Sequence, residues 1–165
     1  MEQIQRIICG NVNSFLISNG NCAILVDTGR EKHRQKVLDA CRPYQVRLLV
    51  LTHGHMDHAQ NAAFLSRELN CPVAMHRADL DLLKDNMSQA LSANTVLGRI
   101  VLSASIKSFQ PNGIPAFTPA VFLDEGDSLE RYGCSVNVVG LSGHTDGSIG
   151  LDVNGTELIV GDALM

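Results

Sequence analysis

A run of seven residues, 52–58, most constrains what this chain can fold into. It reads Thr-His-Gly-His-Met-Asp-His and contains three of the six histidines. It directly follows the apolar run 46–51, which predicts a buried strand, and it precedes apolar residues with helical spacing up to about Leu69. Open α/β sheets form their sites beyond the carboxyl ends of strands. Since imidazole and carboxylate suit a divalent transition metal, the run predicts a metal site between a strand and a helix.

The spacing within this run predicts two groups of ligands. His53 and His55 are two residues apart, so in extended backbone their side chains leave on the same side and can face one metal. Asp57 and His58 follow where the helix is expected to begin, and they can face a second metal beside the first. The alternative is a solvated loop that happens to be rich in histidine. The strand and helix patterns on either side make that alternative weak.

These ligand types predict hydrolytic chemistry. Two metals about 3.5–4 Å apart can share a water and lower its pKa from about 15.7 towards 7. The hydroxide then attacks an activated carbonyl, while a metal polarises the carbonyl oxygen. We therefore expect a metal-dependent hydrolase that uses a metal-bound hydroxide on a small activated ester, thioester, lactone or amide. Asp57 is the candidate catalytic residue, because it can orient the hydroxide.

Four ordered motifs resemble the metallo-β-lactamase superfamily, which includes glyoxalase II-like hydrolases. Residues 52–58 resemble its T-H-x-H-x-D-H signature, and residues 24–29 resemble its strand ending in D-T-G. Residues 141–150 resemble its G-H-T-x-G-S segment, and residues 158–165 its strand ending in G-D. The resemblance implies an α/β fold, a four-layer αββα sandwich, formed here by a single domain over residues 1–165 with its C-terminal helix and strand portion missing.

The resemblance also assigns ligands to the two metals. These are His53, His55 and His144 for one metal, Asp57 and His58 for the other, and Asp162 as the bridge between them. The implied cofactor is Zn²⁺, two ions per chain, with Fe or Mn as alternatives. Asp27 would accept a hydrogen bond from a ligand imidazole and fix its tautomer. By itself, the Asp-Thr-Gly triplet is also used by aspartic proteases, but those enzymes need two copies and this chain has one.

The end of the chain differs from the family pattern. The family adds one more histidine after a further strand and helix, and this sequence has no histidine after His144. A sheet covered on one side only would expose an apolar face. Three explanations stay open: a fragment of a longer chain, a homodimer in which a partner covers that face or lends a ligand, and a shortened relative with an impaired site.

Periodicity and turn residues predict the order of elements. Expected strands are 4–8, 14–18, 22–27, 46–51, 73–75, 120–123, 128–131, 134–139, 148–153 and 157–160. Expected helices are 31–41, a helix after residues 52–58 that runs to about Leu69, and 78–83. Residues 86–119 predict an insertion, which either shapes the substrate cleft or is an ordinary connection.

Composition narrows the class of partner. The net charge is −4 and no run of Lys or Arg occurs, which argues against a nucleic-acid surface and favours a small-molecule substrate. No apolar segment reaches the length of a membrane span. The five cysteines are odd in number and widely spaced, which is typical of reduced thiols, and no signal-peptide layout begins the chain. We therefore expect a cytoplasmic protein.

Two other functions fit parts of the pattern. A mononuclear-iron oxidoreductase of the persulfide dioxygenase kind resembles this family and uses two histidines and an aspartate, so metal identity would discriminate it. A non-catalytic binding or assembly domain is favoured if the missing histidine weakens metal binding. His76 and His33 lie outside the motifs and are most simply surface or helix positions.

Overall fold

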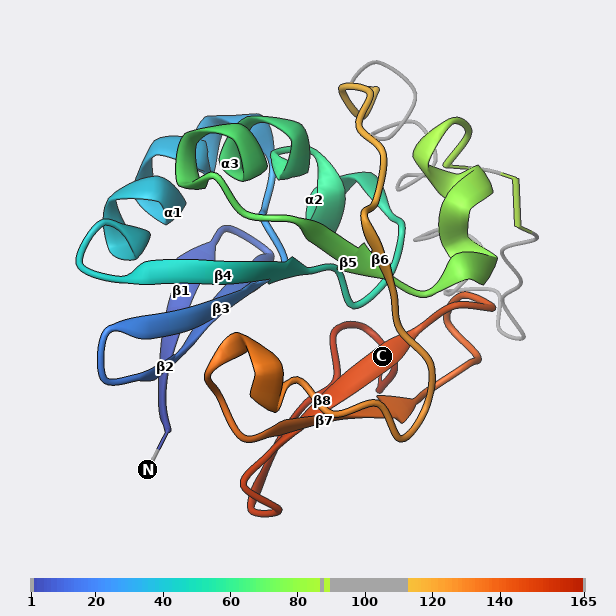
Figure 1. Ribbon diagram of the computed structural model, residues 1–165. Coiled ribbons are helices and arrows are strands. Elements are labelled where there is room, and N and C mark those ends of the chain that lie inside the picture. Colours follow the sequence, from blue (N-terminus) through green and yellow to red (C-terminus); the bar gives the residue numbers. More distant parts are fainter. Residues whose placement is uncertain (1, 87, 90–112, 165) are drawn as a thin grey trace.

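The computed structural model describes residues 2–86, 88–89 and 113–164. These residues form three layers: helices, a larger mixed sheet, and a smaller antiparallel sheet (Figure 1). Most of the expected insertion, residues 86–119, lies outside the described part of the chain. Within the described part, none of the helices has the length and hydrophobicity that crossing a bilayer requires.

The larger sheet has six described strands in the order in which they occur along the chain. They are β1 Gln3–Cys9, β2 Val12–Asn19, β3 Cys22–Val26, β4 Gln45–Val50, β5 Val73–Met75 and β6 Val121–Phe122. The first three pair antiparallel through tight turns, whereas β3, β4, β5 and β6 pair parallel. Because parallel strands end at one edge of a sheet, the segments after β3 and β4 meet there.

Helices cover one face of this sheet. They are the 3-10 turn η1 Glu31–His33, α1 Arg34–Cys41, α2 Met56–Ala59, α3 Ala62–Leu69 and the 3-10 segment η2 Arg77–Leu83. Leu25 and Leu49 of the sheet pack with Val37 of α1 and Leu65 of α3, and all four side chains are fully buried. This close-packed apolar layer fixes the position of β4 and therefore of residues 52–58, which follow it.

The other face of the sheet packs on the second sheet. That sheet contains β7 Val136–Gly140, β8 Ile149–Val153 and β9 Glu157–Ile159, all antiparallel, after a short 3-10 helix, η3 Glu130–Tyr132. In β3, Ile24 and Val26 face the second sheet while Ala23 and Leu25 face the helices. Burial on both faces explains why β3 and the second half of β4, residues 48–50, are apolar without alternation.

One expected strand differs from the structure, and one expected helix is preceded by a break. The expected strand 128–131 is wrong: Ser128 makes one isolated bridge to Asn137, and the chain then turns through η3, closed by Gly133 in the left-handed region. The expected helix after residues 52–58 is present as α3 and ends at Leu69, and the short α2, which is separated from it at Asn61, precedes it. The Asn61 side chain binds backbone carbonyls of another segment, which fixes the break.

Candidate metal centre

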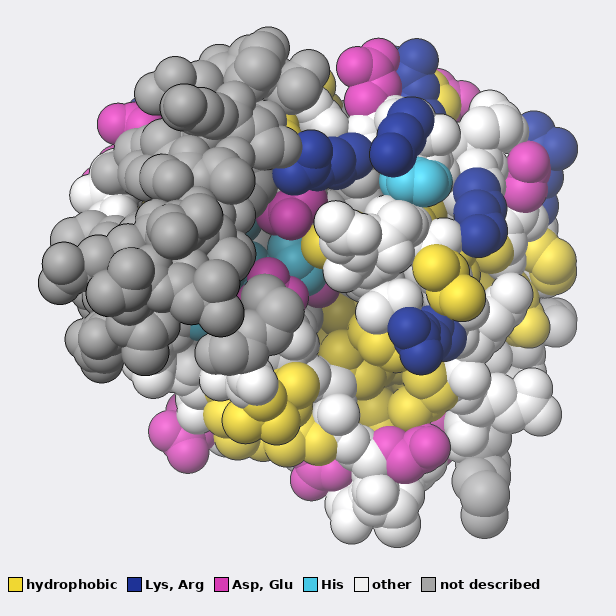
Figure 2. Space-filling view, turned by 180° about the vertical axis from the view of Figure 1, so that it is seen from behind, with side chains coloured by type: hydrophobic (Ala, Val, Ile, Leu, Met, Phe, Trp, Pro, Cys, Tyr) yellow, Lys and Arg dark blue, Asp and Glu magenta, His cyan; other side chains and the backbone are white. Residues whose placement is uncertain are grey.

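The candidate site lies at the edge where β3 and β4 end, and four separate segments of the chain reach it. Asp27 follows β3, residues 52–58 follow β4, His144 lies between β7 and β8, and Asp162 follows β9. Figure 2 shows histidine and acidic side chains together in a recess of the molecular surface, with Lys or Arg side chains along its border. The site therefore joins the two sheets.

Four imidazoles meet in this recess. The ring centroid of His53 lies 4.9 Å from that of His55, 4.2 Å from that of His58 and 4.8 Å from that of His144. Two groups of side chains have ligand atoms within 4.8 Å of one another: His53, His55 and His144 form one, and His53, His58 and Asp162 form the other. His55 Nδ1 and His144 Nε2 are 3.0 Å apart, so both nitrogens point at the same place.

The protonation of His53 fits a metal ligand. Its side chain is buried, its Nδ1 lies 3.1 Å from Thr52 Oγ1, and its Nε2 has no hydrogen-bond partner among the residues that the structure describes. Burial, together with the neighbouring His58 and His55, lowers the His53 pKa well below its usual value. A neutral imidazole with a buried, unpartnered nitrogen is costly unless a further group binds it, and a metal ion would meet that need.

Asp27 fixes the orientation of His58. His58 Nδ1 lies 2.8 Å from Asp27 Oδ2, so the other ring nitrogen faces the recess. Thr52 donates to the same carboxylate twice, from its backbone N–H and from its hydroxyl, both at 2.8 Å. Asp27 is buried and has φ of 57°, a left-handed conformation that non-glycine residues rarely adopt. These three contacts hold Asp27 in that conformation. A carboxylate fixed in this way can orient the imidazole of a metal ligand.

Asp162 belongs to the second group of ligands and also lies near His144 of the first. Its Oδ1 is 3.4 Å from His58 Nε2 and its Oδ2 is 3.8 Å from His144 Nε2. Burial acts to raise the pKa of Asp162, but the hydrogen bond and charge of His58 outweigh it and hold that pKa below its usual value. Burial likewise acts to lower the pKa of His58, but Asp27 and Asp162 raise it well above its usual value. An ionised carboxylate between two imidazoles is suited to contact two metal ions.

Asp57 is near the ligands but belongs to neither of these groups among the described residues. It lies in the first turn of α2, next to His58, and burial raises the pKa of its carboxyl. His76, in contrast, lies apart: its Nδ1 accepts a hydrogen bond from the Ala78 N–H and its Nε2 is 3.3 Å from Asp124.

One buried residue of the site is not identified by sequence motifs. Asp79, in η2, is fully buried and holds the two ligand loops together. Its Oδ2 accepts hydrogen bonds from the Gly54 N–H at 2.9 Å and the Thr145 hydroxyl at 2.8 Å, and its Oδ1 accepts from the Gly147 N–H at 2.8 Å. Gly54 separates His53 from His55 in the chain, so one carboxylate links the loop of these ligands to the loop of His144.

The close approach of these loops requires glycine. A Cβ on Gly54 would lie 2.9 Å from the Asp79 carbonyl oxygen and 2.8 Å from Leu82 Cβ, and a Cβ on Gly147 would lie 2.7 Å from Asp79 Cγ. All three separations are shorter than Cβ atoms in real structures show. Gly54 thus makes room for the backbone of Asp79 and for Leu82, and Gly147 makes room for the Asp79 carboxylate. The sequence contains both glycines but does not reveal which residue they accommodate.

Comparison with known proteins supplies the family. The family model described as the metallo-beta-lactamase superfamily matches residues 7–165. The chain belongs to this superfamily. A metallo-beta-lactamase from Cronobacter sakazakii superposes with a TM-score of 0.70 at 16% identity, over 94% of this chain and 58% of that one. A subclass B3 enzyme of Bradyrhizobium japonicum gives 0.69 at 18% identity, over 96% and 57%. The metallo-β-lactamase-like αββα class expected from sequence is confirmed, and the described residues form three of its four layers.

Sequence relatives carry less functional information. An uncharacterized protein of Mycobacterium bovis is 32% identical over 133 residues, which are 79% of this chain and 54% of that protein. A hydroxyacylglutathione hydrolase of Anaeromyxobacter dehalogenans is 29% identical over 128 residues, 73% of this chain and 47% of that protein. The chain thus spans about half the length of the curated relatives it matches. Membership of the superfamily points to metal-dependent hydrolysis at a coarse level.

Proposed function

We propose that this chain carries the metal centre of a hydrolase that cleaves a small activated ester, thioester, lactone or amide. The observation that carries the proposal is the convergence of four imidazoles and one carboxylate on a recess where His53 Nε2 is buried without a partner among the described residues. His53, His55 and His144 would hold one ion, and His58 and Asp162, with Asp57 nearby, would hold the other. Two zinc ions are the proposed content.

The residues of the chain prepare the centre for this chemistry. A divalent metal, when bound, supplies a water of lowered pKa and a Lewis acid for the carbonyl oxygen. Asp27 contacts His58 Nδ1, so Nε2 is the ring nitrogen that faces the recess, and a metal bound there would displace the proton that the raised pKa of His58 favours. Asp79 keeps the two loops at their separation through backbone N–H groups. The low pKa of His53 keeps its imidazole neutral at neutral pH, as a ligand must be.

A thioester is the first substrate class to test. Support comes from the relative named hydroxyacylglutathione hydrolase, whose name describes a thioester substrate. Thioesters are also more activated carbonyl compounds than amides, so a small thioester places a low demand on substrate positioning. Release of the free thiol can be followed optically with a chromogenic thiol reagent.

The test combines metal analysis with a matched pair of variants. We expect elemental analysis of the purified protein to find zinc, and we expect chelator-treated protein to regain thioester hydrolysis when zinc is added back. His55→Asn should lose metal and activity together, whereas His76→Asn, a histidine outside the recess, should retain both. Iron as the sole metal would point to the oxidoreductase instead. Hydrolysis that is unaffected by chelator or by His55→Asn would refute the proposal.

A further inference from the structure

The side chain of Asn86 joins the end of η2 to the start of α2. Its Oδ1 accepts a hydrogen bond from the Met56 N–H at 2.5 Å, and its Nδ2 donates to the Leu82 carbonyl at 2.6 Å. Met56 is the first residue of α2 and stands between His55 and Asp57 in the chain. The first N–H groups of a helix have no acceptor within the helix, so Asn86 supplies one from another segment. The contact therefore fixes where this helix begins.

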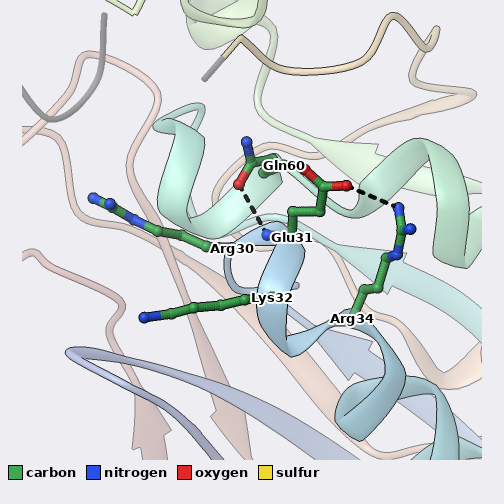
Figure 3. A pocket seen from close by; sticks show the side chains of 5 residues that line it. All are labelled: Arg30, Glu31, Lys32, Arg34 and Gln60. Atoms are coloured by element: carbon green, nitrogen blue, oxygen red, sulfur yellow. Dashed lines mark hydrogen bonds and ion pairs between the residues drawn. The ribbon is translucent and has the colours of Figure 1, made fainter. Parts of the chain in front are cut away.

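α2 depends on such contacts because it is only four residues long. A helix of this length is not stable by itself in water, so neighbouring segments must hold it. At its far end, Gln60 Oε1 accepts a hydrogen bond from the Glu31 N–H at 2.9 Å, as Figure 3 shows. At its start, the side-chain acceptor is Asn86 Oδ1. Asp57 and His58 lie between these two contacts, so the directions of their side chains depend on both.

The side chain of Gln89 joins the start of η2 to the loop of His144. Its Oε1 accepts a hydrogen bond from the Asp146 N–H at 2.8 Å, and its Nε2 donates to the Ala78 carbonyl and to Asp79 Oδ1, both at 3.1 Å. Asp79 itself binds the residues on either side of Asp146. The three residues that follow His144 in the chain are thus all held against η2.

An amide is the group that fits both positions. Each of these side chains presents its oxygen to a backbone N–H and its nitrogen to acceptor oxygens. A carboxylate of the same size would place an oxygen against the Leu82 carbonyl or against Asp79. An apolar side chain would leave the Met56 N–H or the Asp146 N–H without this acceptor. The two amides therefore connect η2 to the two ligand segments separately, one to each.

We propose that Asn86 and Gln89 are positioning residues that set the two groups of metal ligands independently. Asn86 sets Asp57 and His58 through the start of α2, whereas Gln89 sets His144 through its loop. This inference rests on the proposed metal centre and adds to it two residues that bind no metal themselves. Substituting a residue that orients a metal ligand typically lowers metal affinity about 10- to 100-fold, so each amide should govern the affinity of one ion.

The test measures zinc binding at each imidazole rather than turnover. The imidazole ¹⁵N chemical shifts of histidine-labelled protein report which rings bind zinc, and His58→Asn and His144→Asn assign the two signals. Metal-free protein is titrated with zinc in competition with a chelator of known affinity. Asn86→Leu and Gln89→Met roughly keep side-chain size and remove the hydrogen bonds. Asn86→Leu should weaken zinc binding at His58 about 10- to 100-fold and change His144 much less, and Gln89→Met should do the reverse.

Matched controls come from amides on the surface. Gln35 donates to Asp39 at 3.0 Å on the exposed side of α1, and Asn19 is exposed at the end of β2. Gln35→Met and Asn19→Leu should leave zinc binding unchanged at both imidazoles. Asn86→Ala and Gln89→Ala, measured alongside, separate the loss of hydrogen bonds from a poor fit of the larger side chain. Urea unfolding of the metal-free protein verifies that each variant is folded.

The outcomes that overturn the inference are distinct. Equal weakening at His58 and His144 would mean a general loss of stability, and unchanged binding at both would mean that the amides do not act on the ligands. If both variants at one position fail to fold, that amide supports the fold as a whole, and the inference is wrong.

These results are separable from the hydrolase proposal. Zinc-dependent thioester cleavage by a protein whose variants show no selectivity would refute the inference alone. Selective loss of zinc in a protein without zinc-dependent cleavage would refute the hydrolase function alone. A wild-type protein that binds no zinc would refute both.

Discussion

Replacing Asp79 with asparagine should weaken metal binding although Asp79 belongs to neither group of candidate ligands. The substitution keeps the size of the side chain and replaces one carboxylate oxygen with an NH₂ group. Each oxygen of Asp79 now accepts at least one backbone N–H, from Gly54 or from Gly147. Whichever way the amide turns, one of these N–H groups faces another donor instead of an acceptor.

The structure sets the size of the effect. A buried N–H that loses its acceptor costs about 1–3 kcal/mol, so Asp79→Asn should lower the free energy of unfolding by about that amount. Asp79→Ala removes both acceptors and should cost about 2–6 kcal/mol, which is a large part of a typical total of about 5–15 kcal/mol. The asparagine variant is therefore the one to measure. Because the displaced Gly54 separates His53 from His55, metal affinity should fall about 10- to 100-fold.

The assay is a competition titration of the metal-free protein with zinc and a chromophoric chelator, together with urea unfolding. Asp39→Asn is the matched control: it makes the same chemical change on the exposed surface of α1, where Asp39 pairs with Gln35 and Arg42. It should leave both quantities within experimental error. If Asp79→Asn binds zinc as tightly as the wild type, the reasoning that Asp79 positions the two ligand loops is refuted.

Three further predictions concern other parts of the molecule. Gly161→Ala should lower both the melting temperature and zinc affinity, since its Cβ would lie 2.5 Å from the Thr52 hydroxyl oxygen. Gly155 also has a positive φ, but a Cβ there meets nothing within 4 Å, so Gly155→Ala should show only the smaller cost of backbone strain. Burial raises the pKa of the Cys41 thiol to about 12, so iodoacetamide should modify the partly exposed Cys22 first, as peptide mass analysis would show, and early loss of Cys41 would contradict the buried core. Burial and the nearby histidines lower the pKa of His55 from 6.5 to about 4. As the pH falls, the unfolded chain therefore takes up a proton on His55 before the folded chain does, and the metal-free protein should lose stability between about pH 6.5 and 4. Unfolding midpoints that stay constant over this range would contradict the prediction.

The parts of the site that could be predicted from the sequence are those formed by residues close together in the chain. His53, His55 and His58 lie within one short run after an apolar strand, and the end of β4 follows directly from that strand's hydrophobicity. The layered α/β class followed from the alternation of strands and helices, together with the family resemblance.

The remainder depends on contacts between distant segments, which no local pattern encodes. Asp79 receives its hydrogen bonds from residues 54, 145 and 147, so in the sequence it looks like an ordinary acidic residue in the first turn of a short helix. Asn61 likewise interrupts a helical pattern because its partners are 31 to 33 residues earlier. The wrong strand at 128–131 has a local origin: after the single bridge at Ser128 the chain turns through η3 and Gly133, so no ladder forms.

Because the candidate ligands come from both sheets, folding of the hairpin β8–β9 and metal binding should be thermodynamically coupled. His144 and Asp162 flank β8 and β9, and the Ile149 N–H donates to the Thr52 carbonyl at 2.9 Å, beside the first ligand. A metal bound by His53 and Asp162 would close a loop of more than half the chain, and saturation at about 1,000 times the dissociation constant would add about 4 kcal/mol to stability. A core substitution such as Ile159→Ala, made without touching a ligand, would then appear in the laboratory as a metal-binding defect.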